Sequence, residues 1–149
     1  AWNVVIYGAG HVGQACSRLL STLSCRLTVI DSRPEWRSKL PAGIRVLDWA
    51  EPSQRLSELP REAFHVVVTQ DHASDVPILA ALSKFSPRFV GVIGSKAKAA
   101  KLRSELLELG CDWGFVEQVR CPIGLAIGGN DPAEIAVSIV AQLLQARDQ

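Results

Sequence analysis

Trp2-Asn3-Val4-Val5-Ile6-Tyr7 runs directly into the glycine turn Gly8-Ala9-Gly10-His11-Val12-Gly13. The first segment is short, apolar and rich in β-branched residues, which is typical of a buried strand. The three glycines have the spacing that permits a tight turn, close approach of a phosphate to the backbone, and close packing of the helix that follows. This pattern predicts a strand, an anion-accepting turn and a helix.

A helix and a second strand are expected after the glycine turn. Apolar side chains recur at helical spacing at Val12, Cys16, Leu19, Leu20 and Leu23, which predicts one buried helical face. The next apolar segment, Leu27-Thr28-Val29-Ile30, predicts a strand that ends at Asp31. Strand, glycine turn, helix and strand together make one βαβ unit.

The rest of the chain continues this alternation. We expect strands at 44–47, 64–69 and 89–93, a short helix within 53–59, and helices at 75–85, 96–109 and 132–146. Pro77 is assigned to the first turn of its helix, where a missing N–H is tolerated. Asp131 is expected to cap the last helix, and Gly110 to end the one before it. The fold class is therefore α/β, a doubly wound parallel sheet of the Rossmann type in three layers, with residues 1–149 forming one domain.

Composition and charge exclude several classes of protein. Sixteen Lys and Arg against fifteen Asp and Glu give a formal net charge of +1, so no global field favours nucleic acid or an anionic membrane. The four cysteines form no Cys-x-x-Cys pair and have no matching histidine spacing, which argues against a metal site. No secretory signal or membrane span is recognisable, and free thiols in a reducing cytoplasm are the expectation.

Polar residues follow each predicted strand, where ligands of open parallel sheets bind. The Asp31 carboxylate is placed to accept both hydroxyls of a ribose, and Arg33 either meets a 2′-phosphate or remains a solvated loop charge. An Asp beside an Arg does not select between NAD and NADP. The sequence Gly94-Ser95-Lys96-Ala97-Lys98 places a cap and two lysines at a helix start, an arrangement that becomes favourable when an oxyanion docks there.

The loop Thr69-Gln70-Asp71-His72 follows the fourth predicted strand. Structural roles as turn or cap residues are favoured for Asp71 and Asp75, whereas His72 could position a ligand or exchange protons. No serine or cysteine nucleophile is motif-paired with a base, and the Gly-x-Ser-x-Gly elbow is absent from the sequence, so no catalytic residue is predicted.

Five ordered motifs together resemble one family. They are the glycine turn continued by Gln14-Ala15, Asp31-Ser32-Arg33-Pro34-Glu35-Trp36, Asp71-His72 with Asp75, Ile93-Gly94-Ser95-Lys96, and Cys121-Pro122-Ile123-Gly124-Leu125. With the helix segment Pro132-Ala133-Glu134-Ile135-Ala136-Val137-Ser138-Ile139, they make the chain similar to the C-terminal Rossmann domain of the XdhC family of xanthine dehydrogenase accessory proteins. The N-terminal segment of that family, which carries its own cysteine motif, is missing here, so the chain is expected to be one domain of a longer protein.

The resemblance implies a cytoplasmic accessory protein, with the redox chemistry left to its partner. It implies binding of molybdenum cofactor (molybdopterin) and partnership with a molybdenum hydroxylase of the xanthine dehydrogenase type and with a cysteine desulfurase. The motifs and strand-end positions together nominate these cofactor-binding residues: Gly8, Gly10, His11, Val12, Gly13, Asp31, Arg33, Asp71, His72, Gly94, Ser95, Lys96, Pro122 and Gly124.

Two other functions remain open at this stage. An NAD-sensing regulatory domain like those that gate potassium transport has the same glycine turn and strand-ending Asp, but the Pro-Ile-Gly-Leu segment argues against it. An NAD(P)-dependent oxidoreductase would need a separate substrate domain, for which 149 residues leave little room. The Leu-bearing helices also raise the hypothesis of a homodimer.

Overall fold

The computed structural model describes residues 1–69 and 71–149. Its elements are β1 (Trp2–Tyr7), α1 (His11–Leu20), β2 (Cys25–Ile30), α2 (Pro34–Arg37), β3 (Arg45–Leu47), the 3₁₀ turns η1 (Pro52–Gln54) and η2 (Leu56–Glu58), β4 (Phe64–Val67), α3 (His72–Leu82), β5 (Phe89–Val92), α4 (Lys96–Glu108), α5 (Trp113–Gln118) and α6 (Pro132–Arg147). The strands form one parallel sheet in the order β3-β2-β1-β4-β5. This confirms the predicted Rossmann-like α/β class.

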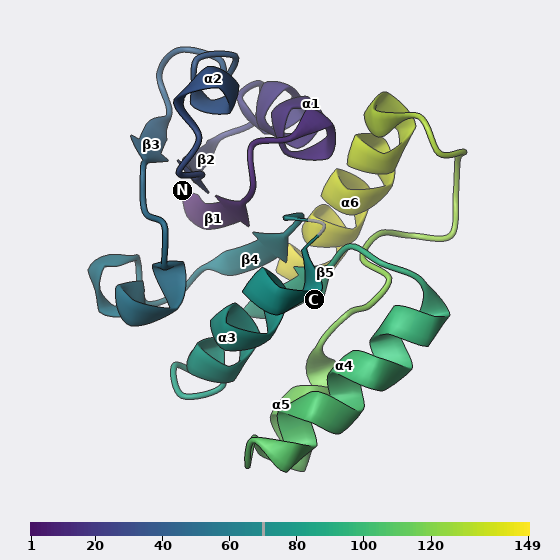
Figure 1. Cartoon of the computed structure of the whole chain (residues 1–149). Helices are drawn as coiled ribbons and strands as arrows, with labels where there is room; N and C mark the ends of the chain where they lie inside the picture. The colour runs from purple at the N-terminus through teal and green to yellow at the C-terminus, as the bar shows by residue number, and fades with distance from the viewer. Residues whose placement is uncertain (70) are drawn as a thin grey trace.

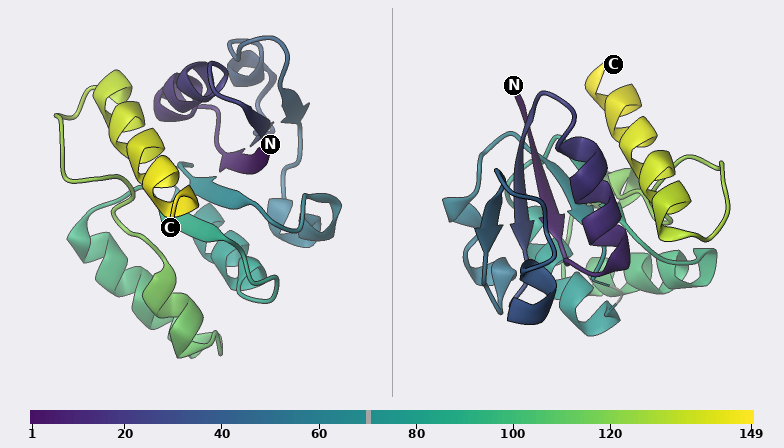
Figure 2. Two further views of the ribbon diagram at one scale, coloured as in Figure 1. Left: turned by 180° about the vertical axis from the view of Figure 1, so that it is seen from behind. Right: turned by 90° about the horizontal axis from the view of Figure 1, so that it is seen from above.

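Helices cover both faces of the sheet. Figure 1 shows α1 and α6 side by side on one face, with α3, α4 and α5 on the other, and the view from behind in Figure 2 agrees. On the α1 and α6 face, Val4, Ile6, Val29 and Val66 of the strands meet side chains of both helices. Alternate strand residues supply the opposite core, as the two-residue period of a strand requires. Two apolar cores therefore hold the central strands from both sides.

The helix α3 begins earlier than the sequence predicts. The Asp71 carboxylate accepts the Ala73 N–H at 3.2 Å, and this cap starts the helix at His72 rather than at Asp75. Pro77 consequently lies inside the helix and not in its first turn. A side-chain cap one turn upstream outweighs the one hydrogen bond that proline cannot donate.

Several short elements also differ from expectation. The predicted helix within 53–59 is two 3₁₀ turns, and the short helices α2 and α5 fall in segments for which no helix was predicted. The predicted helix ends that depend on local capping are confirmed. Asp131 caps the start of α6. Gly110, with φ of +85°, follows the end of α4. Among the described residues, no helix combines the length and the apolar character needed to cross a bilayer.

A polar pair lies within the second core, between β1 and β4. His65 is 4% exposed, and its Nδ1 lies 2.9 Å from the Tyr7 hydroxyl. Burial lowers the pKa of His65 from its ordinary 6.5 to about 4. The imidazole is therefore neutral in the folded protein at neutral pH.

We expect this histidine to destabilise the fold in mild acid. The unfolded chain takes up a proton as the pH falls below 6.5, but folded His65 takes one up only near pH 4. The free energy of unfolding should therefore fall by about 3 kcal/mol across that interval. Urea unfolding followed by circular dichroism at several pH values measures the change. His65→Asn, which keeps an acceptor for Tyr7, should show a shallower pH dependence; parallel profiles would contradict the prediction.

Candidate functional site

A cavity of about 300 Å³ lies at the carboxyl ends of β1, β2 and β4. The order of the sheet changes direction between β1 and β4, which is where ligands of this fold class bind. The cavity brings together four residues that the sequence singles out, namely Gly8, Asp31, Arg33 and Asp71. The buried ring of Trp49, which sequence patterns did not single out, supplies one apolar wall.

The glycine turn joins β1 to α1 beside this cavity. Gly8 has φ of +111°, a conformation that L side chains rarely adopt, and its N–H donates to the Ile30 carbonyl at 2.9 Å. A Cβ on Gly13 would lie 1.9 Å from the Gly8 carbonyl oxygen, so the helix could not approach the turn. A Cβ on Gly10 would meet no described atom within 4 Å. The first and third glycines therefore serve the fold, whereas Gly10 faces open space.

Asp31 ties the end of β2 to the glycine turn. Its carboxylate accepts the Ala9 N–H at 2.7 Å. It also accepts hydrogen bonds from two nitrogens of the Arg33 side chain, at 2.9 and 2.7 Å. Burial opposes ionisation, but the hydrogen bonds from Arg33 and Ala9, together with the Arg33 charge, outweigh it and hold the pKa of Asp31 below its ordinary value. The carboxylate expected to bind ribose is thus already engaged by the protein.

Arg33 lies at the mouth of the cavity and is not a free loop charge. Its side chain, 47% exposed, pairs with Asp31 while the guanidinium carbon sits 5.0 Å from the centre of the Trp36 ring. The His11 ring meets the edge of Trp36 at a centroid distance of 5.2 Å. By contrast, Val12 is buried in the core on the α1 side and does not face the cavity. His11 and Arg33 therefore both contact Trp36, and of the two only Arg33 is among the described lining residues of the cavity.

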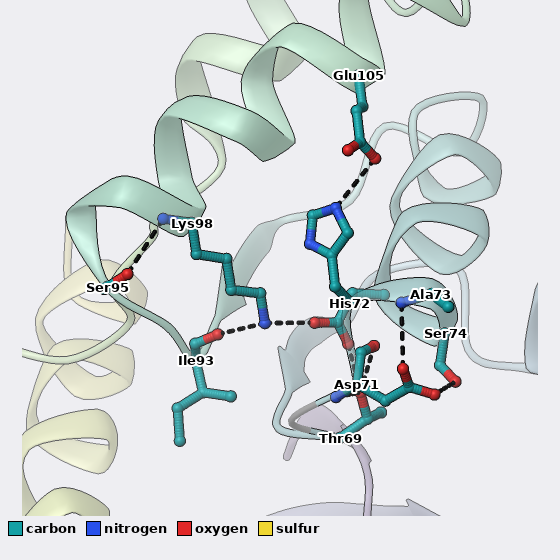
Figure 3. A network of polar contacts seen from close by, with 10 residues as sticks. Thr69, Asp71, His72, Ala73, Ser74, Ile93, Ser95, Lys98 and Glu105 are labelled. Atoms are coloured by element: carbon teal, nitrogen blue, oxygen red, sulfur yellow. Dashed lines mark hydrogen bonds and ion pairs between the residues drawn. The ribbon is translucent and has the colours of Figure 1, made fainter.

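A network of polar contacts continues the rim from β4 to α4 (Figure 3). Asp71 caps α3 and accepts the Ser74 hydroxyl at 2.7 Å, so its predicted structural role is confirmed. His72 Nε2 lies 3.0 Å from a carboxylate oxygen of Glu105 on α4. His72 thus faces the neighbouring helix and is absent from the described lining of the cavity. Gln70 of the same loop lies outside the described residues.

The centre of this network is a buried ion pair. Lys98 Nζ donates to Asp75 at 2.6 Å and to the Ile93 carbonyl at 2.9 Å, and the second Asp75 oxygen accepts the Thr69 hydroxyl. The Asp75 side chain is wholly buried and that of Lys98 is 19% exposed. Figure 3 shows Lys98 reaching from α4 across to the start of α3. The pair joins the segments that follow the two neighbouring strands β4 and β5.

The start of α4 has the predicted cap, but its two lysines lie in different environments. Ser95 accepts the Lys98 N–H at 3.1 Å, while Lys96 is exposed. Gly94, at φ of +155°, leaves the space that the Lys98 side chain crosses, because a Cβ there would lie 2.4 Å from its Cδ. Of the two lysines expected to face an oxyanion, only Lys96 is left outside the ion pair.

Pro122 and Gly124 lie away from the cavity, on the segment that leads to α6. Arg120 and Ile123 exchange backbone hydrogen bonds with β5 and cover its outer edge. The Gly124 N–H donates to the Gln142 side chain at 2.8 Å, and a Cβ at Gly124 would lie 2.5 Å from Ser138 Oγ. Neither Pro122 nor Gly124 occurs among the described lining residues. In this structure Ile123 and Gly124 hold the segment against β5 and α6, and Pro122 beside them is exposed.

Sequence reasoning undervalued the pair formed by Asp75 and Lys98. A signal for it was present, because both residues open helices that follow adjacent strands, and the carboxyl ends of parallel strands share one edge. The sequence offers no comparable signal for Trp49, which comes from an irregular segment after β3.

Comparisons with known proteins agree with this architecture. A family model described as the XdhC Rossmann domain matches residues 4–143. A Bacillus subtilis protein named as a probable xanthine dehydrogenase component is 30% identical over 150 residues, which is 97% of this chain and 43% of that protein. The uncharacterized protein YqeB of Escherichia coli is 24% identical over 148 residues, 98% of this chain and 27% of its own.

A solved structure gives the same result. The crystal structure of a xanthine dehydrogenase from Bacillus halodurans matches with a TM-score of 0.82 at 26% identity, over 99% of this chain and 43% of that one. The sheet order, glycine turn and strand-end cavity define a Rossmann-type domain. Since the family model covers most of its length, the chain belongs to the XdhC Rossmann-domain family. It spans less than half the length of these relatives.

Proposed function

We propose that this chain is the cofactor-binding domain of an accessory factor that binds molybdenum cofactor or its nucleotide-linked form. The factor would assist sulfuration of the cofactor and its insertion into a molybdenum hydroxylase such as xanthine dehydrogenase. Membership of the XdhC family and similarity to two proteins named for xanthine dehydrogenase support the connection with that enzyme. A cysteine desulfurase is the second proposed partner, and the redox chemistry stays with the hydroxylase.

The single observation that carries this proposal is the open approach to the glycine turn. Molybdenum cofactor is phosphorylated, and a helix start with free N–H groups accepts a phosphate. No side chain among the described residues caps α1, and Gly10 leaves space in front of the turn. The strand-end cavity beside it offers Trp49 as an apolar wall, whereas its arginine, Arg33, is already paired with Asp31. The uncapped helix start and the Trp49 wall fit a phosphorylated ligand with a planar ring system.

The engagement of Asp31 bears on the alternative ligands. A dinucleotide that binds through its ribose diol needs a carboxylate with free lone pairs at the end of β2. Here both oxygens of that carboxylate accept from Arg33, and one also accepts from Ala9. Recognition of NAD would therefore require displacement of Arg33. A ligand that uses the phosphate turn without a ribose contact avoids this cost.

Substitution of Gly10 by Ala tests the proposed phosphate site. The added methyl group meets no described atom and Gly10 has an ordinary φ of −70°, so the fold should be kept. The methyl would stand where a phosphate approaches the backbone, and we expect affinity for molybdenum cofactor to fall about tenfold or more. Calorimetric titration with molybdenum cofactor, CTP, NAD and NADP measures both the preference and the loss.

Gly114→Ala is the matched control, since a Cβ there also meets no described atom and the residue lies in α5. This variant should bind with unchanged affinity and melt at an unchanged or slightly higher temperature. Tight binding of NAD in preference to molybdenum cofactor would favour a sensor or a dehydrogenase. Equal affinities of the Gly10 and Gly114 variants for molybdenum cofactor would remove the glycine turn from the site.

A further inference from the structure

A second cavity lies at the amino ends of the strands, the opposite end of the sheet from the glycine turn. It measures about 540 Å³ and is enclosed by η2, by the segment that leads into β4, and by the residues that end α3. Its position at the amino ends of the strands separates it from the strand-end cavity, with which it shares no lining residue. We refer to it as the lower cavity.

His65 is the buried polar residue of the lower cavity. It is 4% exposed, and its Nδ1 lies 2.9 Å from the Tyr7 hydroxyl. Its other nitrogen, Nε2, has no hydrogen-bond partner among the described residues. Since no fully buried side-chain nitrogen or oxygen in the described part of the chain lacks a partner, Nε2 must reach the space of the cavity.

The contact with Tyr7 fixes the position of the imidazole proton. Burial raises the pKa of the Tyr7 hydroxyl, so this group keeps its proton and needs an acceptor. Nδ1 of His65 is the acceptor within reach among the described residues. The neutral ring then carries its own proton on Nε2. The cavity is therefore presented with an unused N–H donor from a residue that is almost wholly buried.

The walls of the lower cavity suit an apolar body that carries a negative charge. Leu56, Leu59 and Leu82 are buried side chains of its lining, and Phe85 is 46% exposed at its margin. The charged residues around it are Arg61 and Lys84 against Glu62, which leaves an excess of one positive charge. An N–H donor at the base and an excess of cations around it favour an anionic acceptor over a neutral one.

We propose that the lower cavity is a binding site for small carboxylates with an aromatic or branched apolar body, whose carboxylate accepts the Nε2–H of His65. The apolar leucines would take the body of the ligand, and Lys84 and Arg61 would balance its charge. This site is independent of the glycine turn and of the ligand proposed for it.

Benzoate is the probe for this site, and benzamide is its neutral analogue. On the purified 149-residue chain, titration followed by ¹H–¹⁵N NMR should give saturable shifts confined to residues 56–62 and 82–86 and to the His65 ring. A ligand of this size should show a Kd of about 1 to 10 mM. Benzamide should bind about tenfold more weakly because it lacks the charge.

Two variants separate a specific site from weak surface binding. His65→Asn keeps an acceptor for Tyr7 but removes the Nε2–H donor, and should weaken benzoate binding about tenfold. Lys84→Gln alters only an exposed side chain, so its fold should be intact, and it should weaken binding about threefold. Lys101→Gln, at an exposed position of α4, is the charge-matched control and should bind as the wild type does.

A roughly threefold weaker affinity for benzoate in the Lys84 variant, with an unchanged affinity in the Lys101 variant, would support the proposal even if His65→Asn proved unstable. Equal affinities for benzoate and benzamide would overturn it. So would equal effects of the Lys84 and Lys101 substitutions, shifts scattered over the whole surface, or no saturation at concentrations well above about 10 mM.

Discussion

Gly13→Ala should lower the free energy of unfolding by about 3 kcal/mol or more, one of the two largest losses that we expect from a single substitution. The added Cβ would lie 1.9 Å from the Gly8 carbonyl oxygen and 2.9 Å from its carbon. Both are backbone atoms, so no flexible side chain can move aside. The helix α1 would have to withdraw from β1 and from α6, which opens the core that all three share.

Thermal unfolding followed by circular dichroism measures this loss. For a domain of this size, about 3 kcal/mol corresponds to a fall in Tm of roughly 10 °C. Gly10→Ala is the matched control three residues away, because it adds the same methyl group to open space. A similar Tm for the two variants would contradict the assignment of Gly13 to packing and of Gly10 to ligand approach.

Lys98→Met should cost about 3 to 5 kcal/mol, because it leaves the Asp75 carboxylate buried without its cation. Asp75 is wholly buried, and after the change the Thr69 hydroxyl is the side-chain partner that remains to its carboxylate among the described residues. The substitution also removes the donor to the Ile93 carbonyl at the end of β5. Urea unfolding at neutral pH provides the measurement.

The exposed pair of Arg55 and Glu58 is the matched control for this prediction. Both of its side chains are nearly half exposed and screened by solvent, so Glu58→Gln should leave the urea midpoint almost unchanged. The double variant Asp75→Asn with Lys98→Met should recover much of the loss, because no unpaired charge remains. If Lys98→Met cost no more than Glu58→Gln, the ion pair would not be a support of the rim.

The parts of the fold that local patterns determine were predictable from sequence. The apolar run before Gly8 and the helical spacing from Val12 identify β1 and α1, and the strand that ends at Asp31 completes the unit. Asp131 and Gly110 mark helix ends by side-chain and backbone chemistry that acts within a few residues. Such signals do not depend on what packs against them.

The remainder depends on contacts between distant segments. The short helices α2 and α5 have four and six residues, too few to show a helical period. The start of α3 differs from the sequence-based prediction because the Asp71 cap begins the helix one turn upstream and places Pro77 in its interior. For the candidate site, the sequence identifies Gly8, Asp31 and Arg33 as candidate residues. It does not predict that Arg33 holds the Asp31 carboxylate. Likewise, Lys98 reaches Asp75 on another helix. The sequence shows Lys96 and Lys98 as two nearby cations and does not indicate which of them forms an ion pair.

The contact between α1 and α6 has a consequence for synthesis of the protein on the ribosome. Cys16 and Leu20 of α1 share one buried core with Ile139 and Leu143 of α6, so the first helix of this domain reaches its packing partner only after the last helix has been made. At roughly 10 residues per second this delay is on the order of ten seconds. During that time the apolar side of α1 stays in water, open to chaperones or to other nascent chains. Completion of this core is therefore coupled to the end of translation of the domain.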